Sequence, residues 1–103
     1  MNFTTSADIE QAIWDPFSAN IFYFTQEDGT LAAFDVKNPK EALFQVKAHK
    51  KSATTVAVST GVKGLVATAS HDGNCKIWDV NTIKNGEPLL LLDKPMKAVS
   101  IVI

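Results

Sequence analysis

The fold of this chain is decided by the stretch Leu65-Val66-Ala67-Thr68-Ala69-Ser70-His71-Asp72-Gly73-Asn74-Cys75-Lys76-Ile77-Trp78-Asp79. It begins and ends with short runs rich in apolar and β-branched residues, and the dipeptide Asp72-Gly73 lies between them. Glycine accepts the positive φ that a tight hairpin turn demands, so Asp-Gly between two such runs is a strong hairpin signal. The stretch therefore predicts two antiparallel strands joined by a tight turn.

The same pattern occurs once more, 44 positions earlier in the chain. Asp28-Gly29 precedes Asp72-Gly73 by 44 positions, and Phe34-Asp35-Val36 precedes Trp78-Asp79-Val80 by the same distance. A repeat of about 40–45 residues is typical of one four-stranded blade of a β-propeller. The spacing therefore predicts two consecutive blades.

Each repeat contains four short β-rich runs separated by turn residues. In the first repeat these runs are Gln11–Trp14, Ile21–Thr25, Leu31–Asp35 and Leu43–Lys47. In the second they are Thr55–Val58, Leu65–Ala69, Cys75–Asp79 and Leu89–Leu92, and Ala98–Ile103 reads as one further strand. Because no segment shows a 3.6-residue apolar period over ten or more residues, we expect an all-β fold with almost no helix.

The stretch Leu65–Asp79 resembles the signature of the WD40 repeat, and Ala48-His49 stands where that family usually has Gly-His. The resemblance implies a hydrogen-bonded tetrad formed by His49, Thr68, Asp72 and Trp78. The chemistry of the four side chains suits this role, since a carboxylate accepts from an imidazole N–H and a threonine hydroxyl can accept from an indole N–H.

The first repeat departs from this signature. Phe34 replaces the tryptophan, Phe24 stands at the position of Thr68, and Thr5 stands at the position of His49. We therefore expect the first blade to be held by aromatic packing and to lack a tetrad.

These repeats suggest four segments. They are a lead-in at 1–7, a degenerate WD40 blade at 8–47, a signature WD40 blade at 48–92 and the first strand of a further blade at 93–103. A closed propeller typically has 4–8 blades. We therefore expect a propeller fragment whose partners include the remaining blades or further copies of this chain.

A narrower resemblance is to the later repeats of the periodic tryptophan protein 1 family, a WD40 family. It is carried by Asp8-Ile9-Glu10-Gln11 with Trp14, and by Asp28-Gly29, Ala48-His49, Ala67-Thr68-Ala69-Ser70 and Lys76-Ile77-Trp78-Asp79. It implies a scaffold in maturation of the large ribosomal subunit, a nuclear and nucleolar location, and assembly factors and pre-ribosomal RNA as partners. The alternative is a WD40 scaffold of another nuclear or cytosolic complex that binds peptides or histone tails.

Charge is distributed unevenly along the chain, although the net charge is only −1. Residues 1–46 carry seven acids and two lysines, whereas residues 47–103 carry eight lysines and four acids. The cluster Lys47, Lys50 and Lys51 is a candidate contact for RNA phosphates or an acidic peptide. The pair Asp8 and Glu10 is a candidate contact for a basic tail.

The sequence offers no convincing catalytic, cofactor or metal site. Ser70-His71-Asp72 is consecutive, whereas a catalytic triad is assembled in space from separated residues. The spacing of His49, His71, Asp72 and Cys75 matches no standard zinc pattern. We therefore expect neither an enzyme nor a small-molecule substrate. Cys75 is the only cysteine, which excludes an internal disulfide and fits a reducing compartment. We also expect no signal peptide and no membrane span.

Overall fold

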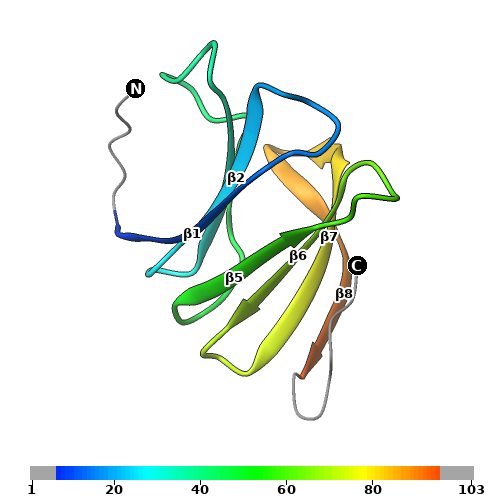
Figure 1. The fold of residues 1–103 in the computed structure, drawn as a ribbon. Coiled ribbons are helices and arrows are strands. Elements are labelled where there is room, and N and C mark those ends of the chain that lie inside the picture. The colour runs from blue at the N-terminus through cyan, green and yellow to red at the C-terminus, as the bar shows by residue number, and fades with distance from the viewer. Residues whose placement is uncertain (1–6, 96–103) are drawn as a thin grey trace.

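The computed structural model describes residues 7–95, which form two four-stranded antiparallel sheets (Figure 1). The first sheet contains β1 (Ile9–Trp14), β2 (Ile21–Gln26), β3 (Thr30–Asp35) and β4 (Phe44–Lys47), in that spatial order. The second contains β5 (Ala53–Val58), β6 (Leu65–Ser70), β7 (Asn74–Lys84) and β8 (Glu87–Pro95), also in chain order. The prediction of an all-β fold with two antiparallel four-stranded blades is confirmed. The expected strand Ala98–Ile103 and most of the lead-in at 1–7 lie outside the described residues.

The 44-residue repeat is reproduced in the strands themselves. The starts of β1, β2 and β3, at Ile9, Ile21 and Thr30, precede those of β5, β6 and β7 by 44 residues each. The register repeats as well, because Phe22 faces Phe34 in the first sheet as Val66 faces Trp78 in the second. The sheets are therefore two copies of one structural unit.

The last hairpin is longer than the sequence pattern predicts. β7 continues to Lys84 and β8 to Pro95, beyond the expected ends at Asp79 and Leu92. Asn85 has a φ of 54° and Gly86 a φ of 78°, and positive φ at both central residues is the geometry of a two-residue hairpin turn. That turn lets the two strands remain paired up to the turn itself, with Ile83 opposite Pro88 and Lys84 opposite Glu87. Residues 93–95, assigned by sequence to a further blade, belong to β8.

The core lies between the two sheets. Since side chains alternate along a strand, each sheet presents every second residue to its neighbour. The shared core consists of Tyr23, Leu31, Ala33, Phe44 and Val46 from the first sheet, Ala48 from the connection, and Val56, Val66 and Trp78 from the second. β1 also packs against β5, so the two sheets are neighbouring layers of one structure.

The opposite face of the first sheet is aromatic. Phe24 and Phe34 stack with ring centroids 5.7 Å apart, and Phe22 stacks on both. Trp14 meets Phe22 edge-on at 5.7 Å, yet 58% of Trp14 is exposed. β1 is the edge strand of the first sheet, and Trp14 is paired with Phe22 on this aromatic face.

Polar contacts also fix the two sheets to each other. The backbone N–H of Val56 in β5 donates to Oε1 of Gln11 in β1 at 2.7 Å. At the end of the connection from β4 to β5, the Ser52 hydroxyl donates to Glu10 at 3.0 Å. The carbonyl of Gly29 accepts from the N–H groups of Ala48 and His49, both at 3.0 Å. The β2–β3 turn therefore supports the connection between the sheets.

The glycines of the two equivalent Asp-Gly turns should differ in their tolerance to substitution. Gly29 and Gly73 both have a positive φ, of 91° and 87°. A Cβ at Gly29 would collide with the backbone carbonyl of His49, whereas a Cβ at Gly73 meets nothing within 4 Å. We expect Gly29→Ala to lower the free energy of unfolding by roughly 2–3 kcal/mol and Gly73→Ala by about 1 kcal/mol. Denaturant unfolding of both variants tests this, and equal losses would contradict the contact.

Candidate functional site

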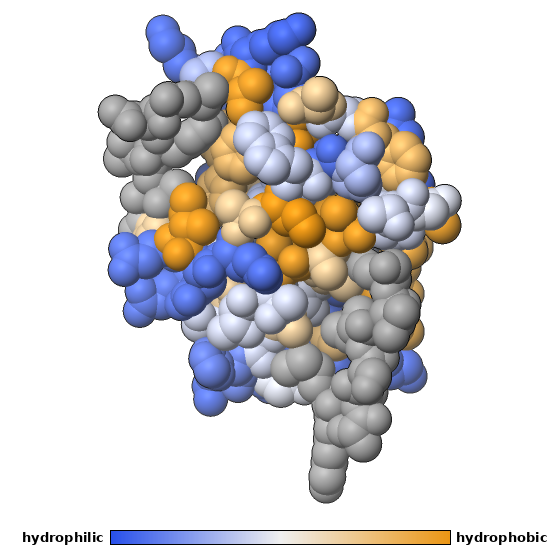
Figure 2. Space-filling view, viewed as in Figure 1, coloured by the Kyte–Doolittle hydropathy of each residue, from blue (hydrophilic) through white to orange (hydrophobic). Residues whose placement is uncertain are grey.

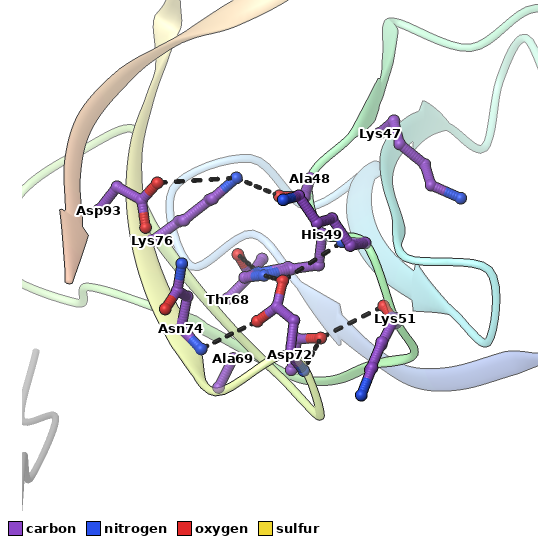
Figure 3. A network of polar contacts seen from close by, with 12 residues as sticks. Lys47, Ala48, His49, Lys51, Thr68, Ala69, Asp72, Asn74, Lys76 and Asp93 are labelled. Carbon is purple, nitrogen blue, oxygen red and sulfur yellow. Dashed lines mark hydrogen bonds and ion pairs between the residues drawn. The ribbon is translucent and has the colours of Figure 1, made fainter. Parts of the chain in front are cut away.

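The site is built around four hydrogen-bonded side chains in the second sheet and the loop that precedes it, of which Figure 3 shows His49, Thr68 and Asp72. The indole N–H of Trp78 in β7 donates to the hydroxyl oxygen of Thr68 in β6 at 3.1 Å. Nε2 of His49 lies 2.8 Å from the same oxygen, and Nδ1 lies 3.0 Å from Oδ2 of Asp72. The structure thus brings together the four residues that the sequence grouped as a tetrad.

The direction of hydrogen bonding follows from the donors available. The Thr68 oxygen accepts from Trp78, so its own proton can point to Nε2 of His49, while Nδ1–H of His49 donates to the carboxylate of Asp72. This arrangement requires a neutral imidazole. Burial lowers the pKa of His49 below its ordinary value, although the hydrogen bond to Asp72 opposes the shift. The ring is therefore neutral near pH 7.

Asp72 is held in its charged form. Burial alone would raise its pKa, but hydrogen bonds from Asn74, His49 and Lys50 outweigh this effect and the pKa is lowered. The N–H of Asn74 donates to Oδ1 at 2.8 Å and the N–H of Lys50 donates to Oδ2 at 3.2 Å. Asp72 therefore joins the β6–β7 turn to the loop before β5.

We name Lys47–Lys51, which contains His49, the lysine loop. Its backbone is fixed at further points, because Lys76 donates to the carbonyl of Ala48 at 2.5 Å and Ser70 donates to that of Lys51 at 3.2 Å. His49 is only 2% exposed, whereas the side chains of Lys47, Lys50 and Lys51 are exposed. Lys47 reaches back to the carbonyl of Asp28. These hydrogen bonds hold the backbone of the loop in place, while its lysine side chains are exposed.

The acidic candidates lie at the same end of the molecule. Glu10 accepts from Ser52, which directly follows the lysine loop. Asp8 is exposed, and its carbonyl accepts from the N–H of Glu27 at 2.8 Å. The two candidate contact sets of opposite charge are therefore close together at the junction of the two sheets.

Sequence reasoning missed Lys76 as a member of this site. Its ammonium lies 4.0 Å from Asp93 and 6.0 Å from the ring centre of Trp78, besides its bond to Ala48. A signal was present, because residues two apart on a strand share a face and Lys76 stands two before Trp78. Gln11, which bonds to β5, was missed because no sequence pattern marks a contact between sheets.

The remaining candidates have structural roles. The Ser70 hydroxyl accepts from the N–H of Asp72 and donates to Lys51, so it is not paired with the exposed His71. Cys75 is buried, and this burial raises the pKa of its thiol. Within residues 7–95 no three His, Cys, Asp or Glu side chains converge as metal ligands. Nor does this part of the chain contain a helix long and apolar enough to cross a membrane.

The network predicts a loss of stability on mild acidification. The pKa of His49 is lower in the folded protein than its ordinary 6.5, so its contribution is present above pH 6.5 and is lost as the pH falls below that value. The lowered pKa of Asp72 adds a second loss below its ordinary 3.8. We expect the melting temperature to fall between pH 7 and 5. His49→Gln should reduce this dependence, whereas His71→Gln should keep it; an unchanged slope in His49→Gln would contradict the assignment.

Comparisons with known proteins agree with the fold. No protein-family model matches the chain. A WD repeat-containing protein of Schizosaccharomyces pombe is 29% identical over 80 residues, covering 78% of this chain and 16% of the relative. The periodic tryptophan protein 1 homolog of Drosophila melanogaster is 27% identical over 79 residues, covering 77% of this chain and 17% of the relative. The histone acetyltransferase type B subunit 2 of Kluyveromyces lactis is 30% identical over 95 residues, covering 88% of this chain and 23% of the relative.

The chain thus spans less than a quarter of the length of each of these relatives. The matches nevertheless cover most of the chain itself, and they fall on both sheets. Taken with the 44-residue repeat of four-stranded antiparallel sheets, they show that this chain belongs to the WD40-repeat family.

Proposed function

We propose that this chain is part of an interaction scaffold in the assembly of the large ribosomal subunit, and that its lysine loop contacts partners. The observation that carries the proposal is the combination of a fixed backbone with exposed lysines at Lys50 and Lys51. A surface that is already rigid loses little conformational entropy when a partner binds. Binding residues are often presented in this way, on loops held by a rigid scaffold.

The comparisons support an interaction scaffold in general and the ribosomal role more narrowly. WD40 chains are interaction scaffolds, and the similarity to the periodic tryptophan protein 1 homolog covers 77% of this chain. By the family resemblance, the partners are assembly-factor proteins and pre-ribosomal RNA, and the location is the nucleus and nucleolus. Lysine ammonium groups suit both partners, because they bind carboxylates and phosphates as point charges.

A second candidate is a scaffold that binds peptides or histone tails in another nuclear or cytosolic complex. It is favoured by the 30% identity to histone acetyltransferase type B subunit 2 over 88% of the chain. A basic tail would be attracted to Asp8 and Glu10 rather than to the lysines. The two candidates therefore predict different residues at the contact.

The test is purification of the tagged full-length protein from cells, followed by identification of bound RNA and protein. We expect precursors of the large ribosomal subunit, and we expect their recovery to fall severalfold when Lys47, Lys50 and Lys51 are changed to Glu. A matched control changes the exposed Lys37, Lys40 and Lys84 to Glu and should retain the precursors. Histone-containing complexes lost on Asp8→Lys and Glu10→Lys would favour the second candidate. Absence of ribosomal precursors would refute the first.

A further inference from the structure

Three tight turns of this chain carry an Asp or Asn directly before a Gly. They are Asp28-Gly29 between β2 and β3, Asp72-Gly73 between β6 and β7, and Asn85-Gly86 between β7 and β8. In such a pair the glycine nitrogen can attack the side-chain carbonyl of the residue before it, because glycine has no Cβ to hinder the approach. The attack closes a five-membered succinimide ring. Whether it occurs in the folded protein depends on how each turn is held.

The peptide group of the first turn is fixed at both ends. The N–H of Gly29 donates to the carbonyl of Gln26 at 3.0 Å, and the carbonyl of Asp28 accepts from the Lys47 ammonium. The Asp28 side chain itself accepts from the N–H of Thr30 at 3.1 Å. Ring closure in this turn therefore requires several hydrogen bonds to break first.

The second turn is fixed in a similar way. The N–H of Gly73 donates to the carbonyl of Ser70 at 3.1 Å. One carboxylate oxygen of Asp72 accepts from the N–H of Asn74 at 2.8 Å, and the other accepts from His49 at 3.0 Å. Both the attacking nitrogen and the side chain that it would attack are thus engaged.

The third turn has none of these bonds. Within residues 7–95 neither the Asn85 side chain nor the Gly86 N–H forms a hydrogen bond. Both residues are exposed, and so are Lys84 and Glu87 on either side. A Cβ on Gly86 would meet no atom within 4 Å, so no other segment crowds the turn. The reacting groups of this turn are therefore free and reached by water.

Few contacts keep this end of the hairpin closed. The register of β7 and β8 shifts between Asp79 and Ile83, and only the pairs Ile83–Pro88 and Lys84–Glu87 lie between that shift and the turn. Residues 84–87 contain no apolar side chain, so they take no part in the apolar surface across the middle of the face in Figure 2. Segments with so few contacts open locally at little cost in free energy. Opening lets the peptide between Asn85 and Gly86 rotate out of its turn conformation.

We propose that Asn85 is a site of spontaneous deamidation, at which the Gly86 nitrogen attacks Cγ of Asn85 in the folded protein. The new N–Cγ bond closes the succinimide, the Cγ–Nδ2 bond breaks, and the proton of the Gly86 nitrogen leaves with the amide group as ammonia. Water then opens the ring. Addition of water at Cγ gives aspartate, and addition at the main-chain carbonyl gives isoaspartate, whose backbone runs through Cγ.

Either product changes the end of the hairpin. A carboxylate replaces a neutral amide close to the carboxylate of Glu87. Isoaspartate also lengthens the backbone of a two-residue turn, and the length of that turn sets the register of the strands beside it. We expect the pairs Ile83–Pro88 and Lys84–Glu87 to be lost in the isoaspartyl form. The proposed function does not enter this inference, because the lysine loop is bonded to Asp72 at the opposite end of β7.

The experiment incubates the folded full-length protein at neutral pH and physiological temperature, and follows each of the three turns by peptide mass spectrometry. Isoaspartate is detected by the transfer of a labelled methyl group from S-adenosylmethionine with an isoaspartyl methyltransferase. The matched control is Asp28→Asn, which places the same dipeptide in the first turn. We expect conversion at Asn85, and conversion at position 28 of the control at least about tenfold more slowly, because hydrogen bonds must break there first. In denaturant the two positions should react at similar rates.

A second variant tests the attacking atom. Gly86→Ala should slow the conversion of Asn85 severalfold, since the added Cβ hinders the nitrogen, and the open surroundings of Gly86 accommodate the methyl group. A rate left unchanged by Gly86→Ala would show that water hydrolyses the amide directly, and the proposal would be wrong. It would be equally wrong if Asn85 stayed intact in the folded protein while the denatured protein converted it. Equal rates at Asn85 and at position 28 in folded Asp28→Asn would also overturn it, because the turns would then not differ.

Discussion

Trp78→Ala should lower the free energy of unfolding by about 3–5 kcal/mol, the largest loss we expect from any single substitution in this chain. Trp78 is 4% exposed and packs in the core between the two sheets. Its removal would leave a cavity, and it would also remove the indole donor from the Thr68 hydroxyl. Both effects act in the folded state, and a domain of this size has only a modest total stability.

The matched control is the other tryptophan. Trp14 is 58% exposed and touches Phe22 only at the edge of the first sheet, so Trp14→Ala should cost about 1 kcal/mol or less. Trp78→Phe should fall between the two, because it keeps most of the packing and loses the N–H. Thermal or denaturant unfolding of the three variants gives the comparison. A neutral Trp78→Ala, or a larger loss for Trp14→Ala, would contradict the assignment of the two blades.

His49→Ala should have the second largest effect, a loss of roughly 3–4 kcal/mol. The imidazole is fully buried between Thr68 and Asp72, so its removal leaves a cavity and takes one hydrogen-bond partner from the Thr68 hydroxyl and one from the Asp72 carboxylate. It also loosens the lysine loop, because Asp72 then holds that loop only through the N–H of Lys50. Besides lower stability, we therefore expect faster amide hydrogen exchange in the loop.

His71 provides the control, since it is exposed and precedes Asp72 in the turn. His71→Ala should change the free energy of unfolding by about 0.5 kcal/mol or less. A double-mutant cycle between His49→Ala and Trp78→Phe should be non-additive, because both side chains bond to the hydroxyl of Thr68. Additive losses would show that the two residues act separately and would rule out a connected network.

The turns, the repeat and the pairing of neighbouring strands were predictable from the sequence, because they depend on residues close together in the chain. The Asp-Gly turns and the 44-residue repeat predict which strands pair, because turn chemistry and strand length set the register of a hairpin. The four network residues could be grouped by family resemblance. Their hydrogen bonds depend on the connection between the sheets. The N–H groups of Ala48 and His49 in that connection donate to the carbonyl of Gly29.

Features that depend on packing between the sheets were not predictable. The exposure of Trp14 is decided by which face of β1 turns toward the second sheet, and the contacts of Gln11 and Lys76 cross from one element to another. The extension of β7 and β8 follows from the conformation of Asn85 and Gly86, which the sequence marks as a turn without giving the length of the flanking ladder. The hollow lined by Tyr23, Phe44 and Asn81 is likewise formed by segments distant in the chain.

The most direct test of this account is the protonation of the His49 ring, because the network that holds the lysine loop requires one tautomer. Long-range ¹H–¹⁵N correlation spectra of the ¹⁵N-labelled protein at pH 7 distinguish the two ring nitrogens. We predict a neutral ring with the proton on Nδ1, bonded to Asp72, and an unprotonated Nε2 that accepts from Thr68. A proton on Nε2 of a neutral ring, or a charged ring at this pH, would contradict the network.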